Sequence, residues 1–160
     1  EIPKRDWSSD VCSSDLILTP DMTPEEFDAV LENVGQIGED TIMKRTGMKL
    51  TKIGFDFAEG AMPVAGNLQP MGLFHGGGHV VLAESLASMH AFARNDGRPV
   101  VGVDLNATHV RAAREGTVHG RAEIIHAGRT IMNHEVRMTD DDGNLLSIVR
   151  ITNFLRRGSN

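Results

Sequence analysis

The chain is poor in cysteine, aromatic residues and long apolar runs, and each shortage excludes a class of protein. Its 160 residues include one cysteine, one tryptophan and no tyrosine, so neither a disulfide nor a cysteine nucleophile is expected. No apolar run approaches the length of a membrane span, and no charged segment followed by an apolar one marks a secretory signal. The expected compartment is therefore the cytoplasm, with no membrane partner.

Positive charge is also scarce. Sixteen basic residues against 22 acidic ones give a formal net charge of −6, and no run of lysine or arginine forms a basic face. Nucleic acid is therefore not an expected partner. A chain of this length buries a single core and is too short for two ordinary domains.

The first sixteen residues are set apart from the fold. The letters DWSSDVCSSDL, from Asp6 to Leu16, resemble the translation of a short-read sequencing adapter and include both Trp7 and Cys12. Residues 1–16 are interpreted as an adapter-derived or disordered segment. Residues 17–157 are predicted to form one domain.

The most informative stretch runs from Gln69 to Ala91, with the sequence QPMGLFHGGGHVVLAESLASMHA. It predicts an apolar helix that begins at three glycines after His75 and carries Glu84 in its middle. Burial of that helix would desolvate Glu84, and an unpaired buried carboxylate is costly, so Glu84 is expected to have a function. The glycine N–H groups lie in the first helical turn, where they can hold a developing oxyanion.

Helical spacing also brings Ser88 one turn beyond Glu84, where its hydroxyl can hydrogen-bond the carboxylate or a water beside it. The alternative interpretation is a buried helix with a glycine-rich entry, a core histidine and a structural glutamate. Residue spacing alone leaves both interpretations open.

Hydrophobic periodicity predicts an α+β fold. Residues Thr23 to Glu26 match a capping box and predict a helix that continues to about Asn33. A short helix is also predicted over 39–45. Strands are predicted at 48–53, 55–64, 101–111, 117–124, 132–138 and 145–155. Alternation over 101–111 puts His109 on the apolar face, provided that no bulge intervenes. The expected architecture is an antiparallel sheet wrapped around one long helix.

From about Asp40 to Leu155 the chain resembles the hotdog-fold acyl-CoA thioesterases of the 4-hydroxybenzoyl-CoA thioesterase superfamily. Within them it looks most like the bacterial aryl-CoA and 1,4-dihydroxy-2-naphthoyl-CoA thioesterases, which carry glutamate on the central helix. The resemblance rests on these residues: Gln69-Pro70, Gly72-Leu73, HGG at 75–77, VVLAES at 80–85, Ser88, and VVGVDLNATHVRAAREG at 100–116. It implies that residues 17–157 form a single hotdog domain.

The resemblance also implies roles for individual residues. Glu84 would be nucleophile or general base, and the Gly76 N–H, helped by Gln69, would polarise the thioester carbonyl. His75 would position the thioester or the leaving group. Ser88 would orient Glu84 or a water. His109 would reach the site from a second subunit, so a homodimer, assembled as a dimer of dimers, is expected.

The expected substrate is an acyl-CoA, so coenzyme A is part of the substrate and no separate cofactor or metal is expected. Arg111 and Arg114, ordinarily solvated, would then face the nucleotide of coenzyme A. Four apolar residues are either core or the lining of an aryl-accepting pocket. They are Met71, Phe74, Met89 and Phe92.

Competing functions have weaker support. The HGGG string resembles the oxyanion-hole motif of lipases, but no serine lies in a G-x-S-x-G frame. A metal site of His75, His79 and Glu84 is disfavoured because His79 points about 140° away from Glu84 around the helix. A hotdog enoyl-thioester hydratase or dehydratase would separate its histidine and acid by a longer, proline-containing stretch. A non-catalytic acyl-CoA-binding regulator would need a DNA-binding appendage.

Overall fold

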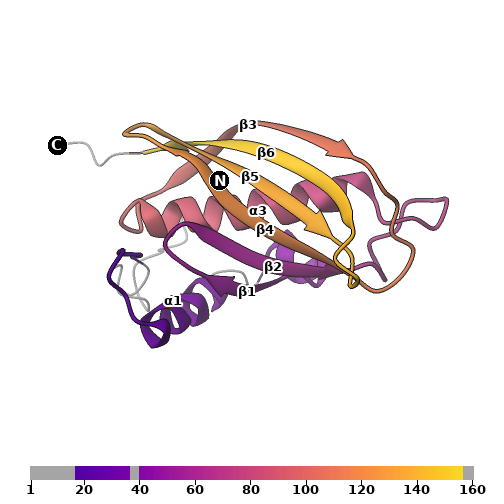
Figure 1. Cartoon of the computed structure of the whole chain (residues 1–160), viewed down its shortest axis with the longest axis horizontal. Coiled ribbons are helices and arrows are strands. Elements are labelled where there is room, and N and C mark those ends of the chain that lie inside the picture. Colours follow the sequence, from indigo (N-terminus) through magenta and orange to yellow (C-terminus); the bar gives the residue numbers. More distant parts are fainter. Residues whose placement is uncertain (1–16, 37–39, 157–160) are drawn as a thin grey trace, which may run out of the picture.

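The computed structural model describes residues 17–36 and 40–156, and the predicted adapter segment lies outside them (Figure 1). The described elements before the long helix are α1 (Pro24–Gln36), α2 (Ile42–Thr46), β1 (Lys49–Ile53) and β2 (Phe57–Pro63). The long helix is α3 (Gly76–Arg94). After it come β3 (Val100–His109), β4 (Thr117–Ala127), β5 (Ile131–Thr139) and β6 (Leu145–Leu155).

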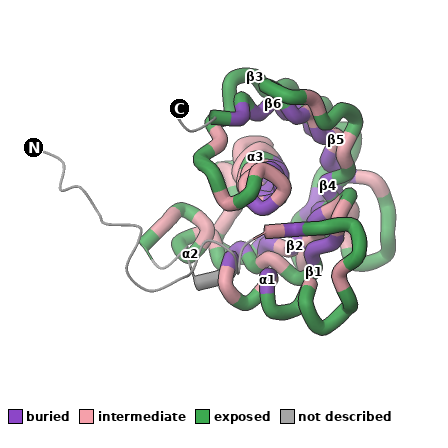
Figure 2. The backbone as a smooth tube through the Cα atoms, turned by 90° about the vertical axis from the view of Figure 1, so that its left-hand side faces the viewer, coloured by how far each residue is buried: buried purple, intermediate pink, exposed green. Residues whose placement is uncertain are grey.

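Within the described residues the strands form one antiparallel sheet in the order β1-β2-β4-β5-β6-β3. The sheet curves around α3, which lies in its hollow (Figure 2). The predicted α+β architecture is therefore confirmed. The bounds predicted for the last strand agree with those of β6.

Leu86 of α3 packs against the sheet and is fully buried. Gly60 and Gly120 pair across β2 and β4, and a Cβ on either would lie 2.7 or 2.9 Å from a Leu86 methyl group. The two glycines therefore make room for the leucine. Burying Leu82 and Leu86 on this side stabilises the fold by about 1.5–3 kcal/mol each.

The two edges of the sheet differ. At the β1 edge, α1 begins with the predicted capping box, since the Thr23 N–H donates to Glu26 Oε2 at 2.7 Å. Val30 and Val34 of α1 pack with Ile53 and so cover that edge. At the β3 edge, Val101 and Val103 are 48% and 60% exposed. A long exposed apolar edge strand is a surface that favours pairing with another strand.

A β-bulge between Gly102 and Asp104 breaks the alternation predicted for β3. Val101 pairs with the exposed Phe154, whereas Gly102 pairs with the buried Asn153. The extra residue therefore turns Val101 outward and Gly102 toward α3. His109 lies beyond the bulge and keeps its predicted inward face.

Candidate active site

The N-terminus of α3 is capped by the side chain of His75. Its Nδ1 accepts a hydrogen bond from the Gly77 N–H at 2.8 Å. An accepting Nδ1 carries no proton, so the neutral ring has its proton on Nε2. His75 is exposed and can donate that N–H outward.

His109 lies directly against this helix start within the same chain. A Cβ added to Gly76 would lie only 2.9 Å from His109 Nε2. Only glycine allows this approach, which brings the end of β3 to the positive end of the α3 dipole.

The hydrogen bonds of Ser147 fix the tautomer of His109. Ser147 Oγ donates to the Thr108 carbonyl at 3.1 Å, which uses its one hydroxyl proton. His109 Nδ1, 2.9 Å from the same oxygen, must then donate to it. The neutral His109 ring therefore has a lone pair on Nε2, facing Gly76.

His79, in the first turns of α3, contacts both His109 and Phe74. Its ring stacks on His109 with centroids 5.1 Å apart and meets Phe74 edge-on at 4.7 Å. Burial, and secondly the neighbouring His109, lowers the pKa of His79 to about 4. His79 is therefore neutral at neutral pH.

These groups line a cavity of about 380 Å³. It collects five of the predicted site residues: Gln69, Phe74, Gly76, His109 and Arg111. The Gln69 side-chain oxygen accepts from the Met71 N–H at 2.7 Å, which leaves the amide NH₂ to donate elsewhere. The cavity thus offers a helix N-terminus, an arginine and an amide NH₂ that has no acceptor among the described residues.

Glu84 lies away from this cavity, on the open side of α3. It is exposed, and no hydrogen bond or ion pair of its carboxylate occurs among the described residues. Its Oε1 lies against β3, 2.8 Å from where a Cβ of Gly102 would be. A helix buried on all sides would desolvate Glu84. The sheet covers only one side of α3, so Glu84 stays exposed in this chain.

Ser88 lies one turn beyond Glu84 and is half-buried. Its hydroxyl donates to Asn153 Oδ1 of β6 at 3.0 Å. Asn153 is fully buried, and its Nδ2 has no hydrogen-bond acceptor among the described residues.

The remaining predicted site residues are not brought to the cavity. Met71 is 79% exposed, and Arg114 is exposed beyond the end of β3. Met89 and Phe92 pack against the apolar cluster under α1, which contains Leu18 and Val30. The packing of Met89 and Phe92 therefore fits their interpretation as core residues.

Sequence reasoning missed three residues of these clusters: His79, Ser147 and Asn153. The sequence indicates His79 only as a candidate metal ligand, and its position around the helix disfavours that role. The strand alternation held a signal for the other two, because both are polar at inward positions of an apolar strand.

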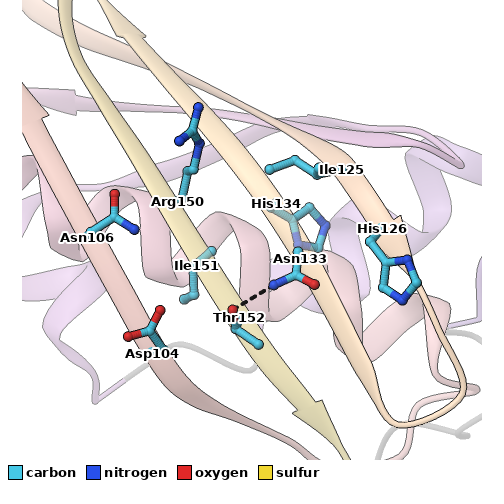
Figure 3. A pocket seen from close by; sticks show the side chains of 9 residues that line it. All are labelled: Asp104, Asn106, Ile125, His126, Asn133, His134, Arg150, Ile151 and Thr152. Carbon is cyan, nitrogen blue, oxygen red and sulfur yellow. Dashed lines mark hydrogen bonds between the residues drawn. The ribbon is translucent and has the colours of Figure 1, made fainter.

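A second cavity, of about 370 Å³, lies over β3, β6 and β5 (Figure 3). Arg150 lines it but is paired with Glu135 at 3.0 Å. No group of three or more histidine, cysteine or acidic residues suited to a metal gathers in the part of the chain that the structure describes.

The far end of α3 holds another histidine pair. His90 Nδ1 is 2.8 Å from His134 Nε2, and His90 Nε2 is 3.1 Å from the carbonyl oxygens of Gly54 and Phe55. Carbonyls only accept, so His90 carries its proton on Nε2 and its Nδ1 accepts from His134. Both rings are fully buried.

The fold agrees with comparisons to known proteins. Residues 71–147 match the Thioesterase superfamily. The chain is 38% identical to a 1,4-dihydroxy-2-naphthoyl-CoA hydrolase of Escherichia coli K12, over 76% of this chain and 91% of that protein. The chain therefore belongs to the thioesterase superfamily, and it is a thioester hydrolase.

Two further relatives extend the match. One is described as a putative esterase of Deinococcus radiodurans, 35% identical over 86% of this chain and 95% of that protein. The other is the crystal structure of a mutant thioesterase from Pseudomonas aeruginosa, 35% identical with a TM-score of 0.74. That alignment covers 78% of this chain and 91% of that one. Separately, no described helix combines the length and apolarity needed to cross a membrane.

Proposed function

We propose that this protein hydrolyses an acyl-CoA thioester with an aryl or related acyl group, using Glu84 of one subunit and the Gly76 cavity of a second. The observation that carries the proposal is the position of these two groups on α3. Gly76 and Glu84 are eight residues apart, so a rise of about 1.5 Å per residue separates their Cα atoms by about 12 Å. Within one chain they belong to two half-sites.

A single thioester must contact both half-sites. Its carbonyl oxygen must lie about 3 Å from the Gly76 N–H, and its carbonyl carbon must lie about 3 Å from the attacking oxygen. The C=O bond is far shorter than the separation along the helix. In addition, the Glu84 carboxylate lies against Gly102, whereas Gly76 lies against His109 at the other end of β3. Two copies of the chain related by a two-fold axis supply both halves of each site.

The exposed edge of β3 supports this pairing. Strand β3 ends the sheet among the described residues, and its apolar side chains at 101 and 103 are exposed. Pairing with the β3 of a second copy covers this edge and runs the two strands antiparallel about a two-fold axis. Such a dimer brings Gly102 of each copy toward the His109 end of the other.

The chemistry requires a polarised carbonyl and an oxygen nucleophile. The Gly76 N–H and the Gln69 amide donate to the carbonyl oxygen as negative charge develops. Glu84 either attacks the carbonyl carbon to form a mixed anhydride, which water then cleaves, or removes a proton from an attacking water. The C–S bond breaks and coenzyme A leaves as a thiolate, which needs no strong general acid. Arg111, at the rim of the cavity, faces the phosphates of coenzyme A.

An assay of thiol release from benzoyl-CoA, 1,4-dihydroxy-2-naphthoyl-CoA and hexanoyl-CoA tests the proposal, with hydration of crotonyl-CoA measured in parallel. We expect hydrolysis, fastest with an aryl substrate. Hydration of crotonyl-CoA without thiol release would favour the hydratase alternative. Binding of acyl-CoA with neither reaction would favour the non-catalytic alternative.

A further inference from the structure

Asn153 has no part in the chemistry described so far, yet it lies beneath the catalytic face of α3. It is fully buried on β6 and accepts a hydrogen bond from Ser88, one turn beyond Glu84. Its Nδ2 has no acceptor among the described residues. A buried N–H group without an acceptor costs about 1–3 kcal/mol, so a fold that retains one calls for an explanation.

The single hydroxyl proton of Ser88 limits which hydrogen bonds its side chain can make. A hydroxyl has one proton, and that of Ser88 is donated to Asn153 Oδ1. Ser88 therefore cannot also donate to Glu84. It can only accept, through the lone pairs that remain on Oγ.

The three polar groups share one region of the fold. Asn153 pairs with Gly102 across β6 and β3, and the Glu84 carboxylate rests on Gly102. Residues paired across antiparallel strands face the same side and lie about 5 Å apart. The Asn153 amide, the Ser88 hydroxyl bonded to it and the Glu84 carboxylate therefore lie on the same side of the β6–β3 pair, beside the position at Gly102 that has no side chain.

These groups have the complement of partners that one water molecule needs. A water donates two hydrogen bonds and accepts others, and a bound water makes about three in all. Glu84 and Ser88 can each accept one of its protons, and Asn153 Nδ2 can donate to its oxygen. One lone pair of the water then remains for reaction.

We propose, on the basis of the proposed function, that Asn153 is a positioning residue for the hydrolytic water held by Glu84 and Ser88. Its Nδ2 donates to the water oxygen, and its Oδ1 takes the Ser88 proton, so that Ser88 accepts from the water. Glu84 takes one proton of the water while the water oxygen bonds to the thioester carbon. The tetrahedral intermediate collapses with cleavage of the C–S bond, and the thiolate of coenzyme A takes up a proton from solvent. The protonated carboxyl returns its proton to solvent. This inference favours the general-base route over the mixed anhydride.

A double-mutant cycle on full-length protein tests the water site, with benzoyl-CoA as the probe. Asn153→Leu removes the amide at similar volume, and Ser88→Ala removes the acceptor. We expect each single variant to lower kcat by about tenfold to a hundredfold with KM within about threefold. Asn153→Leu should lower kcat by less than about threefold further once Ser88→Ala is present, because both act on one water. Asn153→Ala serves if the leucine variant does not fold.

Asn133→Leu is the matched control. This asparagine lies on the neighbouring strand β5, where its amide donates to Thr152 Oγ1 at 2.6 Å (Figure 3). We expect its kcat to stay within about twofold of the unsubstituted protein. The water site would be overturned if Asn153→Leu lowered kcat by the same factor in the presence and in the absence of Ser88. It would also be overturned if the Asn153→Leu single variant kept a kcat within twofold of the unsubstituted protein. Absence of thiol release from the unsubstituted protein would instead overturn the proposed function itself.

Discussion

The two sides of α3 use polar residues in opposite ways. On the side that faces the sheet, His90 is fully buried and both its ring nitrogens have partners, in His134 and in two backbone carbonyls. On the open side, Glu84 is exposed and has no hydrogen-bond or ion-pair partner among the described residues. A polar group satisfied within the chain contributes to stability. A polar group whose partners lie outside the chain is available for chemistry.

The histidines of α3 show the same contrast. His79 and His109 are stacked, with one nitrogen of His109 facing the cavity at Gly76. The rings of His90 and His134 are also 5.1 Å apart but are joined by a direct hydrogen bond and enclosed by the core. Similar spacing thus gives one pair with an exposed ring, that of His109, and one pair in which both rings are buried. Substitutions on the two sides of α3 should therefore affect different observables.

The largest expected effect is on the open side. Glu84→Gln should lower kcat by about a thousandfold or more, because the amide supplies neither an attacking oxygen nor a base. The melting temperature should stay unchanged, since the carboxylate is exposed and has no partner among the described residues. Steady-state thiol release and thermal melts measure both, with Ser85→Ala of the same helix as control. Near-normal turnover in the folded variant would remove Glu84 from the mechanism.

The donor in the cavity should have a smaller effect. Gln69→Ala should lower kcat by about tenfold to a hundredfold and raise KM by less, since an amide donor matters most when the oxygen becomes negative. Steady-state kinetics on the same acyl-CoA separate the two parameters. An effect confined to KM would assign Gln69 to substrate binding in the ground state.

The buried pair should affect stability instead of catalysis. Burial is the main reason that the pKa of His90 falls to about 4 and that of His134, which also faces His90, to about 3. Unfolded histidines titrate near 6.5, so below that pH the unfolded chain binds more protons and the folded state loses stability. Between pH 6.5 and 5 each histidine should cost about 2 kcal/mol of unfolding free energy, and above pH 6.5 the loss should vanish.

A substitution sharpens this test. His134→Leu leaves His90 Nδ1 without its donor, so it should lower the melting temperature at pH 7 but reduce the further fall between pH 7 and pH 5. Denaturant unfolding across that pH range gives the comparison, with exposed His126→Leu as control. An unchanged pH dependence would show that the pair does not govern acid stability.

The smallest expected effect is at the rim of the cavity. Arg111→Gln should raise KM for an acyl-CoA by about threefold to tenfold and leave kcat nearly unchanged, because its proposed contact is with phosphate and not with the reacting carbonyl. An acyl-pantetheine substrate, which lacks the nucleotide, should show no such rise. Arg98→Gln, beyond the far end of α3, is the control. An equal rise with both substrates would contradict a nucleotide contact.

The local rules of the chain predicted much of the fold. The capping box at Thr23, the glycine entry to α3 and the alternation that defines β6 are short-range signals, and each element forms where these signals lie. The bulge after Gly102 was not predictable, because it depends on how β3 pairs with β6. The bulge turns Gly102 toward Glu84, and this orientation depends on tertiary pairing.

The candidate site was predictable in its residue types more than in its geometry. The pattern around His75 and Glu84 indicated an oxyanion site and a carboxylate, and the structure brings Gln69, Gly76 and His109 together. Helical periodicity could not tell that Met89 and Phe92 pack under α1, because that depends on a helix distant in sequence. It also could not reveal the Ser88–Asn153 hydrogen bond, which joins residues 65 positions apart.

Subunit mixing tests the central claim most directly, namely that each active site combines Glu84 of one chain with the Gly76 and His109 cavity of another. Glu84→Ala and His109→Ala homodimers, each impaired, are dissociated, mixed and reassembled, and exchange is verified by native mass spectrometry. The mixed dimer has one site with both substitutions and one site with neither, so thiol release should recover toward half of the unsubstituted activity per mixed dimer. Verified exchange without any recovery of activity would contradict the shared site.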